Sequence, residues 1–324
     1  MFIKEIASVF NKRKGKNRRM KENQFDKKPT VSVVMPIFCH SEEQLTSAIN
    51  SILKQTFQDL ELIVVDGRAD DGNFKIISSF ADPRLKYFKT KGYVNCLNLG
   101  LDKSQGKYIA RMDSDDISYP TRIEEQVRFL DENPSVSVCS CLVELFGDER
   151  PLKCSKHTAD VNLINIIESC EFVHTAMMFR KEINLQYDYI KPLEDCLLFR
   201  KLLLAGHQFE IIDKFLMKSY QSNGSIMCRH PKYITYMLSK INAYALVKYF
   251  HAPLSFTDEI FTKKHFPKQD IIEFLEVVLS LKEKLKPYKM KAVNLFFPYF
   301  LIMMAHSSHK WFLLKTKVFY QTFF

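Results

Sequence analysis

The sequence predicts an α/β protein with a doubly wound, mostly parallel sheet flanked by helices, followed by a mainly helical C-terminal extension. Between residues 31 and 113, short runs of apolar and β-branched residues alternate with amphipathic helical patterns, as parallel sheets require. Two of these runs end in an aspartate, at Asp66 and Asp113. Ligands of doubly wound sheets bind beyond the carboxyl ends of the strands, so both acids are expected along one crevice.

The first predicted strand is VSVVMPIF, residues 31–38, which is apolar enough to be buried and is expected to end at Pro36. Ser41 then offers a helix N-cap, and Gln44 three residues later completes a capping box. The helix that follows has apolar residues at helical spacing, at Leu45, Ala48, Ile49, Ile52 and Leu53.

Further strands and helices alternate up to residue 113. Strands are predicted for LELIVVD, LKYFK and KYIARMD, at residues 60–66, 85–89 and 107–113. Helices are predicted for IISSF and GYVNCLNLGLDKS, at residues 76–80 and 92–104, the second of them ending near Gly106.

Three carboxylates, Asp113, Asp115 and Asp116, follow the apolar run YIARM. In an extended segment Asp113 and Asp115 point the same way and converge on one cation, and paired carboxylates suit Mg²⁺ or Mn²⁺. An alternative is an acidic turn that caps the next helix, TRIEEQVRFL. The segment is therefore a candidate metal site.

Later in the chain the pattern loosens. Strands are predicted for SVSVCSCLVELFG and HTAMMFRKE, residues 135–147 and 174–182. LEDCLLFRKLLLAGH then places Glu194 and Asp195 at the head of a strongly apolar helix that stops at Gly206. Acids are also favoured at any helix N-terminus, so a structural role for the pair stays open.

The net charge of +10 is concentrated at the two ends of the chain. Residues 1–28 carry ten Lys or Arg against three acids, and residues 281–324 carry eight Lys against Glu283. Both ends also hold clustered apolar and aromatic residues, which favours an anionic membrane surface over nucleic acid. A solvated tail is the alternative for residues 1–28. The apolar stretch Ala292–Ala305 is too short and interrupted to span a membrane.

The eight cysteines contain no CxxC pair and lie mostly within apolar patterns, as reduced core thiols do. The first ten residues hold no credible secretory signal. We therefore expect a cytoplasmic protein that attaches peripherally to the inner face of the membrane.

Taken together, these motifs resemble a family 2 glycosyltransferase with a GT-A fold, over roughly residues 31–228. The most specific stretch is YIARMDSDDISYPTRIEEQ. The resemblance implies transfer of one sugar, with inversion, from a nucleotide-sugar to a glycan or lipid-linked acceptor, with Mn²⁺ or Mg²⁺. It divides the chain into a basic segment (1–28), a glycosyltransferase domain (29–228) and a helical, aromatic and basic region (229–324).

The resemblance also implies roles for individual residues. Asp66 would accept a hydrogen bond from a uracil-type base, with Pro36 and Arg111 also on the donor side. Asp113 would lie toward the ribose and the metal, and Asp115 would coordinate the metal. Asp195 would be the general base, with Glu194 beside it, and His174 would lie on the acceptor side. Asp116 is expected to be a cap or supporting group for the next helix. Arg111 and Arg122 would steady the acidic motif or the phosphates, or pair within the scaffold.

Two departures from the family pattern motivate an alternative function. The loop GRADDG leaves the alignment of Asp70 and Asp71 ambiguous, and KSYQSNGSI has Gln221 and Asn223 where the family often has a cation and a histidine. The alternative is a degenerate, non-catalytic member that serves as a binding or scaffold subunit. The family's processive synthases carry a Gln-x-x-Arg-Trp motif, which is absent here, so single-sugar transfer is expected.

Overall fold

The structure is a computed structural model. The part of the chain that it describes comprises residues 28–38, 41–68, 72–147, 162–163, 167, 172–190, 193–221, 231–288, 296, 300 and 303. Residues 1–27 of the predicted N-terminal segment, Asp70 and Asp71 of the GRADDG loop, and Asn223 lie outside the described residues, as does the side chain of Gln221.

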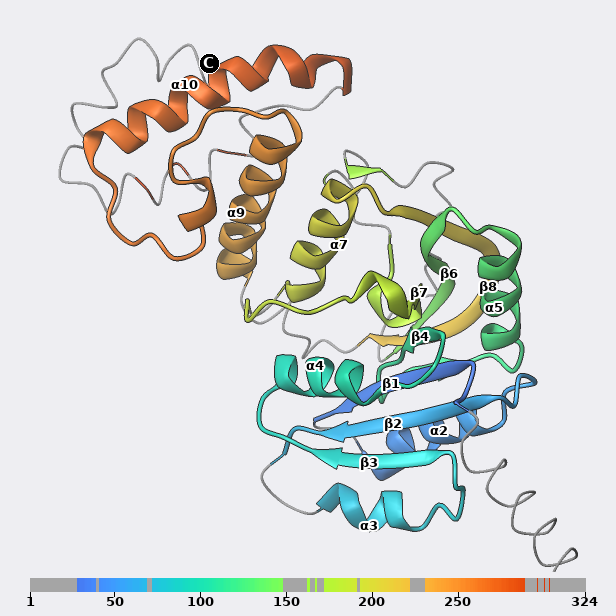
Figure 1. Cartoon of the computed structure of the whole chain (residues 1–324). Coiled ribbons are helices and arrows are strands. Elements are labelled where there is room, and N and C mark those ends of the chain that lie inside the picture. The colour runs from blue at the N-terminus through green and yellow to red at the C-terminus, as the bar shows by residue number, and fades with distance from the viewer. Residues whose placement is uncertain are drawn as a thin grey trace, which may run out of the picture.

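An eight-stranded mixed sheet forms the centre of the molecule, with the strand order β3-β2-β1-β4-β7-β6-β8-β5 (Figure 1). The strands are β1 (Val31–Ile37), β2 (Leu60–Asp66), β3 (Leu85–Lys89), β4 (Tyr108–Arg111), β5 (Ile117–Ser118), β6 (Val136–Gly147), β7 (Met178–Arg180) and β8 (Gln208–Gln221). The first four in the order are mutually parallel, β7 is antiparallel to both its neighbours, β6 and β8 are parallel, and β5 and β8 are antiparallel. The predicted mostly parallel sheet is confirmed.

Helices cover both faces of this sheet. The helices of the described residues are α2 (Glu42–Leu53), α3 (Gly72–Ser78), α4 (Tyr93–Lys103), α5 (Arg122–Glu132) and α7 (Glu194–Leu204), followed in the C-terminal part by α9 (Pro231–Tyr249) and α10 (Lys268–Leu285), with short 3-10 turns η1 (His174–Ala176), η2 (Lys181–Ile183), η3 (Thr257–Glu259) and η4 (Lys286–Tyr288). On one face, Val33 and Met35 of β1 share a core with α2 and α5. On the other face, Val34 packs with α4 and α7. Because β1 is buried on both faces, its sequence is apolar apart from Ser32, whose hydroxyl donates to Glu61.

Local signals in the sequence correctly predicted two helix ends. The capping box of α2 is present, because Gln44 N–H donates to Ser41 Oγ and Gln44 Oε1 accepts from the Ser41 N–H. Helix α7 ends at Gly206 in the left-handed region, with φ +86°, and the N–H groups of Gly206 and His207 bond back to Leu203 and Leu202 carbonyls. This is a Schellman motif.

Three strand predictions need correction. Strand β1 does not end at Pro36 but continues to Ile37, because β4 no longer pairs with β1 at Pro36 and the missing N–H leaves no ladder bond unmade. HTAMMFRKE is not one strand: it forms η1, β7 and the start of η2. Strand β8 was not predicted.

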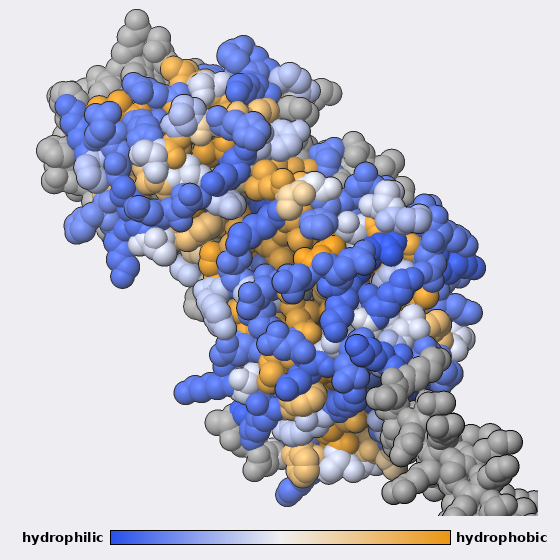
Figure 2. All heavy atoms as spheres, viewed as in Figure 1, coloured by the Kyte–Doolittle hydropathy of each residue, from blue (hydrophilic) through white to orange (hydrophobic). Residues whose placement is uncertain are grey.

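The C-terminal helices form a second core. Residues of α9 and α10, together with Phe296, Phe300 and Met303, make one buried cluster. A smaller cluster joins α9 to α7, so this helical unit packs on the sheet-bearing part through α7. Figure 2 shows hydrophobic residues between the C-terminal helices and the sheet-bearing part on the viewed face. Within the described residues, no helix combines the length and apolar character needed to cross a membrane.

Candidate active site

The three predicted acids gather in a turn beyond the end of β4. Ligand oxygens of Asp113, Asp115 and Asp116 lie within 4.8 Å of one another. The reason differs from the one predicted: β4 ends at Arg111, and Ser114 and Asp115 form a turn. The turn, and not the alternation of a strand, therefore brings the carboxylates together.

Asp116 is the buried member of this acidic turn and does not cap a helix. The N-cap of α5 is Thr121, so the cap interpretation of the acids is wrong. Asp116 is 1% exposed, and burial, followed by the charge of Asp113, raises its pKa to about 7. Such crowding of like charges is relieved by a cation, and an all-carboxylate set of oxygen donors suits Mg²⁺ or Mn²⁺. The residues present therefore fit a divalent metal ion.

Thr175 of η1 fastens the acidic turn. Its Oγ1 accepts from the Asp113 N–H at 2.9 Å and donates to Asp116 Oδ2 at 2.6 Å. The other oxygen of Asp116 accepts from the Tyr220 N–H at 2.9 Å. One hydroxyl thus links the backbone of one acid to the side chain of another, and no sequence motif singled it out.

Arg111 lies buried beside the turn, with 2% of its surface exposed. Its Nη1 is 2.6 Å from Asp113 Oδ1, and its Nη2 donates to the Tyr93 hydroxyl. Its Nε has no hydrogen-bond partner among the described residues. The buried guanidinium therefore fixes the carboxylate of Asp113 through this ion pair.

Arg122 steadies the motif through the backbone. It is fully buried, and its Nη2 donates to the carbonyls of Arg111, at 2.7 Å, and Thr175, at 3.2 Å. These two contacts join the end of β4 to η1. Arg122 therefore supports the backbone on both sides of the acidic motif through hydrogen bonds to carbonyls.

Asp66 and the acidic turn flank the carboxyl end of β1. Asp66 pairs in register with Ile37 on one side, while Ser114 Oγ donates to the Pro36 carbonyl at 3.2 Å on the other. Asp66 is fully buried, and its carboxylate accepts from the Arg68 N–H, Asn73 Nδ2 and the Tyr87 hydroxyl. The structure thus places these acids along one edge, as the parallel order predicts.

Glu194 and Asp195 begin α7, directly after a strained residue. Leu193 has φ +88°, a left-handed conformation that non-glycine residues rarely adopt. Asp195 Oδ1 accepts from the Cys196 N–H at 2.7 Å. Burial raises the pKa of Asp195, and the bond from Cys196 and the charge of Arg111 oppose this effect. Asp195 therefore lies within electrostatic range of the arginine that holds Asp113.

His174 lies in the same neighbourhood but is paired. Its Nε2 is 2.6 Å from the Tyr187 hydroxyl, and burial, followed by the charge of Arg111, holds its pKa well below the usual range. His174 is consequently neutral at physiological pH. Burial raises the pKa of both Tyr187 and Tyr93, and the charges of Arg111, Asp113 and Glu194 also act on both, so the two tyrosines belong to the same electrostatic neighbourhood. Sequence reasoning had missed both.

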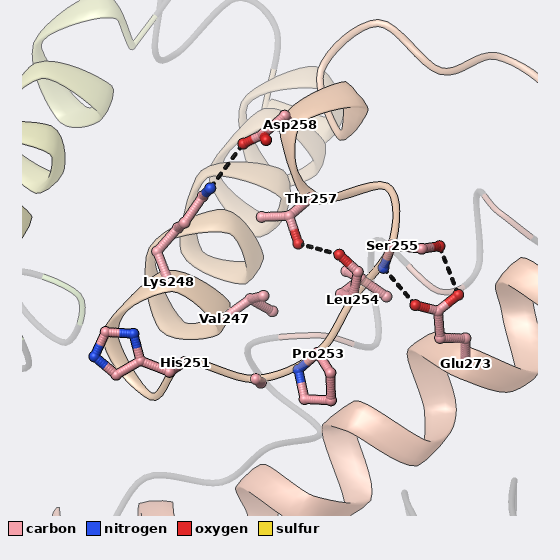
Figure 3. Close-up of a pocket in the computed structure, with 10 residues that line it drawn as sticks. Val247, Lys248, His251, Pro253, Leu254, Ser255, Thr257, Asp258 and Glu273 are labelled. Atoms are coloured by element: carbon pink, nitrogen blue, oxygen red, sulfur yellow. Dashed lines mark hydrogen bonds and ion pairs between the residues drawn. The ribbon is translucent and has the colours of Figure 1, made fainter.

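A separate cavity of about 480 Å³ lies in the C-terminal helical unit, between the end of α9 and α10 (Figure 3). Several of the polar side chains that line it are paired: Lys248 with Asp258 at 2.8 Å, Ser255 with Glu273 at 2.7 Å, and Thr257 with the Leu254 carbonyl at 2.7 Å. None of the predicted site residues lines it.

Comparison with known proteins identifies relatives of this chain. The family model "Glycosyl transferase family 2" matches residues 32–191. "Bifunctional glycosyltransferase pgtA" of Dictyostelium discoideum is 31% identical over 178 residues, which are 45% of this chain and 23% of that protein. "Uncharacterized glycosyltransferase RT0329" of Rickettsia typhi is 25% identical over 286 residues, which are 82% of this chain and 88% of that protein. The chain thus spans about a quarter of the length of the first relative.

Among solved structures, S. aureus TarS 1-349 in complex with UDP-GlcNAc has the same fold. It superposes with a TM-score of 0.54 at 19% identity, over 85% of this chain and 91% of that one. The likeness includes the C-terminal helices as well as the sheet, because it extends over most of both chains.

Proposed function

Residues 32–191 belong to glycosyltransferase family 2, and from this we propose that the chain transfers one sugar, with inversion, from a UDP-sugar to a hydroxyl of a glycan or lipid-linked acceptor. The observation that carries the proposal is the gathering of Asp113, Asp115 and Asp116 at the edge where Asp66 ends β2. Asp66 would accept a hydrogen bond from an N–H of the base, and UDP is proposed because the fold neighbour TarS was solved with UDP-GlcNAc.

Asp113, Asp115 and Asp195 have separate chemical roles in this proposal. Asp113 and Asp115 would hold Mn²⁺ or Mg²⁺, which when bound offsets the charge that builds on the departing diphosphate. Arg111 keeps Asp113 oriented through its buried ion pair. Asp195 accepts the proton of the acceptor hydroxyl while that oxygen bonds to the anomeric carbon and the bond from this carbon to the diphosphate oxygen breaks. The nucleoside diphosphate leaves from the opposite face, which inverts the anomeric carbon.

The proposal also includes the domain boundaries of the chain and its location in the cell. We take residues 29–228 as the glycosyltransferase domain and 229–324 as a helical region. The basic ends would hold the protein at the inner, anionic face of the cytoplasmic membrane, where a lipid-linked acceptor lies.

A screen of UDP- and GDP-sugars with Mn²⁺, read as donor hydrolysis and by calorimetry, tests the function. We expect one donor to bind only with the metal present, and Asp115→Asn to lose hydrolysis by at least 100-fold while its unfolding midpoint stays within a few degrees. Asp131→Asn is the control, because Asp131 pairs with Lys107 on the surface. A wild-type protein that binds no donor would favour the non-catalytic alternative.

A further inference from the structure

Tyr189 presents an exposed aromatic ring beside the active site. With 73% of its surface exposed, it is the most exposed large hydrophobic side chain among the described residues. The ring is nevertheless tethered, because its hydroxyl donates to Asn95 Oδ1 at 2.8 Å and Asn95 Nδ2 donates in turn to the Lys91 carbonyl at 2.6 Å. An aromatic ring fixed in solvent is pre-organised for contact with a ligand.

A small hollow lies against this ring. It has a volume of about 190 Å³ and is lined by Gly92, Tyr93, Val94, Asn95 and Tyr189. This volume is below the roughly 300–1,000 Å³ of pockets for drug-sized ligands, so the hollow suits one ring rather than a chain. Its walls combine aromatic surface with the amide of Asn95, which matches a molecule that has both an apolar face and hydroxyl groups.

The hollow shares one residue with the site already described. Tyr93 lines it and also receives a hydrogen bond from Arg111, which holds Asp113. On the other side, the backbone of Tyr187 is pinned to Asn98 of α4 by two hydrogen bonds, of 2.9 and 3.0 Å. The segment that carries Tyr189 therefore lies against α4 just before the chain enters α7.

We propose that Tyr189 and the Gly92–Asn95 turn form a subsite for one pyranose ring of the acceptor, which stacks on the tyrosine. The C–H face of a pyranose is apolar and packs on an aromatic face, while its hydroxyls bond to amides at the rim. The subsite is assigned to the acceptor because Tyr189 is on the segment leading to Asp195, which must touch the acceptor hydroxyl. The inference rests on the proposed function for its assignment to the acceptor.

Saturation-transfer NMR with free methyl glycosides tests this subsite without knowledge of the acceptor. The probes are methyl glucoside, galactoside, mannoside and N-acetylglucosaminide, each added to the full chain, with UDP and Mn²⁺ measured in parallel. We expect at least one glycoside to bind, and Tyr189→Ala to weaken its binding about fivefold, as loss of an aromatic stacking contact would. Tyr189→Phe keeps the ring but loses the hydrogen bond to Asn95, so its affinity is expected to fall between those of the wild type and Tyr189→Ala.

Tyr233→Ala is the matched control, because Tyr233 is an exposed tyrosine on α9, with 46% of its surface accessible. It is expected to bind the glycoside as the wild type does. The subsite is refuted if no glycoside binds the wild type, or if Tyr189→Ala binds as well as the wild type. Absence of UDP–Mn²⁺ binding would instead refute the proposed function, and a Tyr189-dependent glycoside signal would then stand as a sugar site without a transfer reaction.

Discussion

At the scale of single residues, the surroundings of Asp195 determine the expected pH dependence. Burial raises its pKa above the usual value of about 3.9 for an aspartate, so the deprotonated form that accepts a proton is lost at a higher pH than for an exposed acid. We therefore expect kcat to fall as the pH decreases through this raised pKa. Asp195→Asn should lower kcat by about 10²–10⁴-fold.

The measurement is a pH–rate profile of kcat with the donor found in the screen. Asp188→Asn is the control, because Asp188 is on the same segment but pairs with Lys201 at 2.8 Å and is partly exposed. Its profile should keep the acidic limb of the wild type. A kcat for Asp195→Asn within threefold of the wild type would exclude Asp195 as the base.

Thr175 is predicted to be a positioning residue for the metal. Thr175→Val keeps the shape of the side chain but removes both hydrogen bonds, leaving the Asp113 N–H and one Asp116 oxygen without this partner. Supporting groups of metal ligands are typically worth about 10- to 100-fold in metal affinity, and we expect a loss of this size. Thr175→Ser retains the hydroxyl and should restore binding.

Calorimetric titration of Mn²⁺ in the presence of UDP measures this effect. Thr257→Val serves as the control, since Thr257 is a buried threonine of the C-terminal unit whose hydroxyl donates to the Leu254 carbonyl. That variant should bind Mn²⁺ normally. Equal Mn²⁺ affinities for Thr175→Val and the wild type would show that the hydroxyl has a merely structural role.

The residues of the candidate site divide according to how far their contacts reach along the chain. Asp66 and Asp113 were predictable, because each follows an apolar run and parallel strands end at one edge. Thr175 was not, because its importance comes from a contact 59 residues away with Asp116. Tyr187 was missed for a similar reason: its backbone is fixed by Asn98, 89 residues earlier, and no periodic pattern surrounds it.

At the scale of secondary-structure elements, two helices end in the same way with different residues. The N–H groups of His251 and Ala252 bond back to the Lys248 and Val247 carbonyls, so α9 closes in a Schellman motif like that of α7. His251 has φ +50° at the position where α7 has Gly206. A non-glycine residue is strained in this conformation.

This difference predicts opposite effects on stability. The left-handed conformation costs a non-glycine residue roughly 1–2 kcal/mol, whereas a glycine lowers stability by about 0.4–1 kcal/mol because it makes the unfolded chain more flexible. On balance we expect His251→Gly to stabilise the protein by about 0.5–1 kcal/mol and Gly206→Ala to destabilise it by a similar amount. Space is not the cause at Gly206, because a Cβ there would meet nothing within 4 Å. Urea unfolding midpoints measure both changes.

His251→Ala is the control, since it keeps a side chain in the strained conformation and should change little. The histidine side chain is exposed at the cavity of Figure 3, and among the described residues it makes no hydrogen bond or ion pair that the substitutions would remove. A destabilised His251→Gly would mean that the left-handed residue is not strained here.

The long strand β8 shows where pattern reasoning fails at this scale. Phe209 and Ile211 alternate correctly with polar neighbours, but the register with β6 then shifts, so that Cys141 pairs with Ile212 and Leu142 with Phe215. The extra residues at this bulge interrupt the period of two on which strand prediction depends. By contrast, β2 and β3 have unbroken registers and were predicted with their observed bounds.

At the scale of the whole molecule, two separate cores are joined through α7. One face of this helix contributes Leu198 and Phe199 to the core under the sheet, and another contributes Leu193 and Leu197 to the cluster with α9. Arg200, fully buried, adds a hydrogen bond to Asn242 of α9 at 3.1 Å. The C-terminal unit therefore packs on α7, the helix that begins with Glu194 and Asp195. We infer that this packing helps to fix the orientation of Asp195, the proposed base.

The distribution of charge over the whole chain predicts its attachment to membranes. The basic run near the N-terminus follows an apolar helical pattern, and each Lys or Arg near an anionic surface contributes about 1 kcal/mol. We expect the protein to float with phosphatidylserine-containing liposomes at low salt and to be released as the salt concentration rises, because surface charges are then screened. Neutral liposomes should not bind it.

A charge-neutralised variant separates this electrostatic attachment from non-specific adsorption to liposomes. Six basic residues are changed to glutamine: Lys12, Arg13, Lys14, Lys16, Arg18 and Arg19. The variant should remain in the soluble fraction at salt concentrations where the wild type floats, while donor hydrolysis without liposomes stays unchanged, because none of the six is among the proposed site residues. If the wild type stays soluble at every salt concentration, or if the variant floats equally well, the basic N-terminal segment is not what places the enzyme at its acceptor.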